Sequence, residues 1–106
     1  MTTALDLDTP GYTQLKIEFW YCCVGMETGE DFFVEYSSNG GSNWTTIEDY
    51  ISGTDFVNEE FYYVYLLVDE SSYSFTNNVK IRFICDATGD GDDVIIDEVR
   101  ISARIY

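Results

Sequence analysis

The sequence contains no histidine, and its five lysine and arginine residues stand against 20 aspartate and glutamate residues. The missing histidine removes the commonest catalytic base, the imidazole of a catalytic triad and the usual zinc ligand. The formal charge of -15 excludes a nucleic-acid binder that works through a basic face, and it disfavours docking on anionic membranes. The sequence also lacks an apolar run long enough to span a bilayer and a signal peptide at its start.

Apolar and aromatic residues are plentiful. Hydrophobic residues make up 45% of the 106 residues and aromatic residues 17%, which is too much for a disordered acidic tail. A chain of this length forms one small domain around one core, with little to spare. Residues 1–8 are polar, so we expect a mature protein or an excised domain. Asn43-Trp44-Thr45 matches the N-glycosylation pattern, but the triplet is common by chance and adds little to the case for secretion.

Alternation of apolar and polar residues predicts β-strands over most of the chain. The predicted strands cover residues 15–24, 32–37, 44–50, 61–68, 79–85 and 94–101, with a short strand at 5–7 and a hairpin turn at 39–41. No stretch shows a helical repeat. We therefore predict an all-β fold, a jelly-roll-like antiparallel β-sandwich in which residues 1–106 form a single domain. The predicted core consists of Leu15, Ile17, Phe19, Phe32, Val34, Tyr36, Val64, Leu66, Ile81 and Phe83.

The three cysteines allow two interpretations. Cys22 and Cys23 are neighbours in one strand and point to opposite faces, so at most one of them meets Cys85 easily. In the first interpretation all three are buried thiols that act as small hydrophobic residues. In the second, which requires secretion, Cys23 and Cys85 form a disulfide inside the sandwich and Cys22 faces outward.

Two segments resemble extracellular sandwich domains of the MAM-like and carbohydrate-binding jelly-roll kind. They are LKIEFWYCCVGMETGEDFFVEYSSNGGSNWTTI and VKIRFICDATGDGDDVIIDEVRIS, and the resemblance runs from about Leu5 to Ser102. It implies the sandwich fold, while adhesion, glycan binding and simple spacing are all functions found on such domains. Related domains carry a further strand before the position of Leu5, so the resemblance also implies that this domain lacks an N-terminal strand and leaves a sheet edge unpaired.

The acidic residues near the end of the chain suggest calcium. Strict alternation over residues 93–101 puts Asp97 on one face with Ile95, Val99 and Ile101, and a carboxylate buried there needs a cation or backbone donors. Calcium takes six to eight oxygen ligands, often carboxylates from separate loops, and the resemblance to calcium-bearing jelly rolls points the same way. Two alternatives stay open: solvated turn acids, or the opposite parity with Val94 and Ile96 inward and Asp97 exposed. The predicted calcium ligands are Glu30, Asp31, Asp86, Asp93 and Asp97.

The aromatic residues of the strands are the second candidate site. With the parities above, Trp20, Phe33, Tyr63 and Tyr65 face outward, where flat sugar rings stack on aromatic faces. The alternative is that loops, another subunit or another domain cover them, and strand aromatics do mostly pack against cross-strand neighbours.

Catalysis is not expected. Twenty acidic residues make accidental carboxylate pairs certain, so a pair alone does not indicate glycoside hydrolysis. The sequence has no nucleophile elbow, phosphate loop or Cys/His dyad. We expect a non-catalytic, extracellular, calcium-stabilised binding or adhesion module whose partner is a glycan or another extracellular protein, with no nucleic acid and no membrane insertion. The alternative is a structural subunit of an extracellular assembly or filament that self-associates by strand exchange at an open sheet edge.

Overall fold

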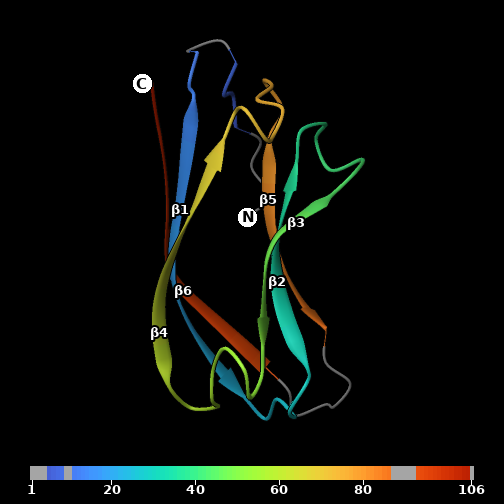
Figure 1. The fold of residues 1–106 in the computed structure, drawn as a ribbon, viewed down its shortest axis with the longest axis vertical. Helices are drawn as coiled ribbons and strands as arrows, with labels where there is room; N and C mark the ends of the chain where they lie inside the picture. Colours follow the sequence, from blue (N-terminus) through green and yellow to red (C-terminus); the bar gives the residue numbers. More distant parts are fainter. Residues whose placement is uncertain (1–4, 9–10, 87–92, 106) are drawn as a thin grey trace.

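The computed structural model of the protein is a sandwich of two antiparallel sheets. The structure describes residues 5–8, 11–86 and 93–105, with the side chains of Asp86 and Asp93 outside the description. One sheet has the strand order β4-β1-β6 and the other β3-β2-β5, and Figure 1 shows them as two layers. The strands are β1 (Gln14–Val24), β2 (Asp31–Ser37), β3 (Thr45–Ile51), β4 (Phe61–Asp69), β5 (Lys80–Asp86) and β6 (Asp93–Arg104).

These elements confirm the all-β prediction. Each of the six longer predicted strands matches one observed strand to within a few residues, and the described part of the chain contains no helix. The predicted short strand at residues 5–7 is reduced to a bridge, in which Leu5 exchanges two backbone hydrogen bonds with Val79. The architecture fits one small β-sandwich domain.

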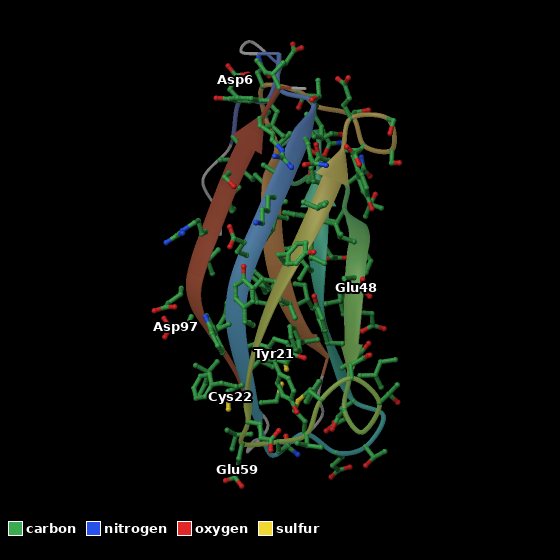
Figure 2. The ribbon with its side chains drawn as sticks, turned by 60° about the vertical axis from the view of Figure 1, so that its left-hand side comes forward. Asp6, Tyr21, Cys22, Glu48, Glu59 and Asp97 are labelled. Atoms are coloured by element: carbon green, nitrogen blue, oxygen red, sulfur yellow. The ribbon has the colours of Figure 1, made fainter. Side chains whose placement is uncertain are left out.

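The core lies between the two sheets, as the alternation predicts. Phe19 on β1 is fully buried and meets Phe83 on β5 edge to face, with ring centroids 5.0 Å apart. Tyr21 reaches into the same space and packs at 4.8 Å from the Phe32 ring; Figure 2 shows it low in the sandwich. Of the ten predicted core residues, seven are buried, and Val64, Leu66 and Phe83 are partly buried against them. Such edge-to-face pairs add stability beyond their buried area, about 0.5–1.5 kcal/mol each.

A β-bulge in β6 breaks its simple alternation. Trp20 pairs with Asp97 and Glu18 pairs with Arg100, so one residue of β1, Phe19, lies opposite two residues of β6. The bulge includes Glu98, which has a φ of 50° that non-glycine residues rarely adopt. The extra residue shifts the strand's parity at this point.

The shift in parity decides the position of Asp97. Before the bulge, Val94 and Ile96 face the core opposite the buried Cys23 and Tyr21. Asp97 is exposed and lies outside β6 in Figure 2. The prediction of an inward Asp97 is therefore wrong, and the opposite parity holds. Ile101 is inward as expected, because the bulge restores the second half of the strand to the core.

Candidate functional site

Three of the four predicted surface aromatics gather on the outer face of the β4-β1-β6 sheet. Trp20 is 38% exposed and is the Cα partner of Tyr63, while Tyr65 lies one row further along β4 opposite Glu18. The fourth, Phe33, is half-buried on β2 in the other sheet, so it does not join them. Alternation predicted the outward direction of each residue, but it could not show which strands share a sheet.

The aromatic rings are held by charged neighbours. The Tyr63 hydroxyl donates to Glu18 Oε2 at 2.5 Å, which lowers the pKa of the Glu18 carboxyl and raises that of Tyr63. Lys16 Nζ lies 3.8 Å from the other Glu18 oxygen and 5.2 Å from the centre of the Tyr65 ring. Trp20 and Tyr63 are in contact, with centroids 5.6 Å apart. These contacts fix the side chains before any ligand arrives.

We call this surface the platform. Two shallow hollows of about 320 and 390 Å³ lie along it, and Glu18 borders both. Three of the five basic residues of the chain, Lys16, Arg100 and Arg104, lie on this outer face, where they offset the negative charges of Glu18 and Asp97. Its members are Lys16, Glu18, Trp20, Tyr63, Tyr65 and Arg100.

Sequence reasoning missed half of the platform. Lys16 and Glu18 alternate with Trp20 in the same strand, so the signal for them was present. Strict alternation also points Arg100 outward, but it does not show that β6 pairs with β1 and so brings Arg100 opposite Glu18.

The predicted calcium ligands are only partly brought together. Asp31 and Asp86 are Cα partners, and Asp93 is the Cα partner of Val24, so these three strand ends lie at the same end of the sandwich. We call this the acidic end. Glu30 accepts a hydrogen bond from the Glu27 backbone there, at 2.7 Å. Among the residues that the structure describes, no group of three or more potential ligands is close enough to hold a metal ion.

Asp97 does not belong to the acidic end. It lies beside Trp20 on the outer face, and its own carboxylate accepts a hydrogen bond from the Glu98 backbone at 2.8 Å. The anchoring role predicted for Asp97 therefore fails on geometry. The calcium site itself stays a prediction, because the loop of residues 87–92 lies outside the description.

A pair of carboxyl groups, Asp31 on β2 and Asp49 on β3, lies on the outer face of the second sheet. A hydrogen bond between them, together with partial burial and the negative charge of Asp49, raises the pKa of Asp31 to about 6. Asp49 Oδ1 is buried and has no hydrogen-bond partner in the described structure. Above its pKa, the deprotonated Asp31 therefore repels its neighbour.

The burial of the three cysteines differs in part from the prediction. The structure has Cys22, Cys23 and Cys85 as thiols, the first two buried and Cys85 exposed. Cys22 is on the outer face, as predicted, yet is buried between its Cα partners Phe61 and Ile95. Burial raises the pKa of the Cys23 thiol to about 12, so the thiol is unreactive in the folded chain. A Cys23–Cys85 disulfide stays a prediction.

On the second sheet, Arg82 contacts both a carboxylate and a tryptophan ring. Arg82 forms a 2.6 Å ion pair with Glu35, and its guanidinium lies 4.1 Å from the centre of the Trp44 ring. One face of the Trp44 ring is therefore already covered by a cation of the same chain. Asn43, of the predicted glycosylation triplet, is exposed in the turn before β3.

Comparisons of the chain with protein families, with curated proteins and with solved structures find no match. The resemblance to MAM-like and carbohydrate-binding jelly rolls therefore stays a prediction. The described residues contain no helix that is long and apolar enough to cross a membrane.

Proposed function

We propose that the domain is a non-catalytic, extracellular binding module that holds a glycan on the platform. The observation that carries this proposal is the exposure of Trp20, Tyr63 and Tyr65 next to one another on one face of a sheet. The apolar faces of sugar rings stack on such aromatic rings. The neighbouring carboxylate and basic groups supply hydrogen-bond acceptors and donors for the sugar hydroxyls.

The surrounding groups define the kind of glycan. Glu18 accepts hydrogen bonds from hydroxyls, and Arg100 and Lys16 donate to hydroxyls or to a carboxylate. The hollows are shallow, so the ligand lies along the sheet as an extended chain and does not enter a deep pocket. We therefore favour a neutral or weakly acidic polysaccharide over a single small sugar.

A glycan array followed by a titration of the best ligand tests the proposal. Trp20→Ala and Tyr63→Ala should each weaken binding by about tenfold or more, since central aromatic side chains dominate such interfaces. Trp44→Ala is the matched control. Trp44 lies just before β3 of the other sheet, against the Arg82 guanidinium, so this variant should bind the glycan like the native chain. Equal loss in Trp20→Ala and Trp44→Ala, with both variants folded, contradicts the proposal.

The proposal includes a structural calcium ion at the acidic end. Its support is the register that brings the strand ends at Asp31, Asp86 and Asp93 to the same end of the sandwich. A dication there offsets the repulsion between carboxylates from segments far apart in sequence.

The alternative function, a subunit of an extracellular assembly, is favoured by a different observation. β6 is an edge strand of 12 residues whose only strand partner in the described chain is β1. Long edge strands are templates for pairing with another chain.

A further inference from the structure

The edge formed by β6 borders an apolar opening in the sandwich. On this side, the described residues leave both β6 and β5 without a further strand partner, and the only pairing is the Leu5–Val79 bridge just before β5. Between the two edges lies a cavity of about 500 Å³, lined mainly by apolar groups. The lining residues are Leu5, Phe83, Ile96, Val99 and Ile101.

Two copies of β6 that run in opposite directions bring opposite charges together. Asp97 and Arg100 lie at equal distances from the centre of the strand, and Asp93 and Arg104 are its two ends. When two copies of β6 pair antiparallel about their centres, Asp97 falls opposite Arg100 of the second copy. Opposite charges directly across a strand pair are stabilising, and like charges are destabilising.

The same register also places inward-facing residues opposite inward-facing ones and outward-facing residues opposite outward-facing ones. Ile96 falls opposite Ile101 of the second copy, and both side chains face the core; Asp97 and Arg100 both face outward. A shift of two residues in one direction puts Asp97 opposite Glu98, and a shift in the other direction puts it opposite Ser102. The charge-matched register is therefore favoured over its neighbours.

We propose that β6 is a self-association edge, at which a second copy of this chain adds its own β6 antiparallel in this register. The two β4-β1-β6 sheets then form one continuous six-stranded sheet, and the apolar opening beside Val99 is covered at the dimer axis. The overall charge of -15 opposes the approach of two copies, and the mixed charges of β6 reduce that repulsion where the chains meet. This dimer does not depend on glycan binding.

Complementary charge reversal tests the register. Asp97→Arg gives a chain with two basic residues at these positions, and Arg100→Asp gives one with two acidic residues. Each variant alone should dimerise with a dissociation constant raised about tenfold or more, because like charges then oppose each other. An equimolar mixture of the two should dimerise nearly as well as the native chain, since opposite charges face each other again in the heterodimer.

Sedimentation velocity over a concentration series, without glycan, measures the dimer. Far-UV circular dichroism and melting curves establish that both variants are folded. Tyr65→Ala, on the opposite edge of the sheet, is the control that should dimerise like the native chain while weakening glycan binding. A native chain that stays monomeric at every concentration, folded single variants that dimerise normally, or a mixture that fails to recover would each overturn the proposal.

Discussion

Replacing Asp31 by asparagine should stabilise the domain at neutral pH. Asp31 on β2 and Asp49 on β3 share a hydrogen bond, which only a protonated carboxyl can donate, and the pKa of Asp31 is raised to about 6. At pH 7 the Asp31 carboxyl is mostly ionised, and its negative charge then repels that of Asp49. In Asp31→Asn, the amide at position 31 carries no charge and keeps a hydrogen-bond donor for the Asp49 carboxylate.

The size of the effect comes from the shift in pKa. The folded state holds the Asp31 proton more tightly than the unfolded chain, whose aspartates titrate near 3.9. The free energy of unfolding therefore falls as the pH rises from about 4 through about 6, the reverse of the usual aspartate behaviour. A shift of about two pKa units corresponds to about 3 kcal/mol, and solvent screening of this partly exposed pair reduces it to about 1 kcal/mol.

Denaturant unfolding followed by circular dichroism, at pH values from about 4 to 7.5 with a chelator present, measures the difference. Asp31→Asn should gain about 1 kcal/mol over the native chain at pH 7, a rise of about 4–8 °C in melting temperature, and should lose the fall in stability between pH 4 and 6. Glu48→Gln is the control, because it removes one negative charge from an exposed position on β3. If both variants keep the native pH dependence, the carboxyl pair does not exist as described.

Three further outcomes follow from the structure. Phe19→Ala should cost about 3–5 kcal/mol in unfolding free energy, because the ring is fully buried; a loss below about 1 kcal/mol would contradict the core packing. Native alkylation followed by intact-mass measurement should label Cys85 and leave Cys22 and Cys23 unmodified until the chain unfolds, whereas a disulfide would leave only one thiol to label after unfolding. Calcium at about 100 times its dissociation constant should add about 2.7 kcal/mol of stability, and Asp97→Ala should keep that gain; a melting curve unchanged by chelator rules the ion out.

Most of the fold follows from a period of two residues. In β1 and β2, strict alternation places Ile17, Phe19 and Val34 between the sheets, because successive side chains of a strand point to opposite faces. Alternation is a local signal and carries no information about which strands pair. Phe33 was therefore grouped with the aromatics of another sheet, although its outward direction was predicted correctly.

The candidate sites were predicted less well, for a physical reason. Parity propagates along a strand only while each residue has one partner, and the bulge opposite Phe19 violates that condition. Strict alternation therefore puts Asp97 on the wrong face. It puts Arg100 on the correct outer face, but it does not show that β6 pairs with β1. The buried Cys22 shows a second limit, since large neighbours on adjacent strands can cover a small outward-facing side chain.

The bulge in β6 also makes this strand tolerant of a shorter sequence. Deleting Glu98 leaves Asp97 opposite Trp20 and Arg100 opposite Glu18, and it brings Val99 opposite the buried Phe19 in an uninterrupted ladder. The strained backbone at φ 50° disappears with the deleted residue. Deleting Val99 instead leaves a carboxylate facing the core, which is costly without a partner. A length variant one residue shorter at this point should therefore fold when it retains the valine and unfold when it retains the glutamate, an asymmetry that thermal melting of the two deletion chains would reveal.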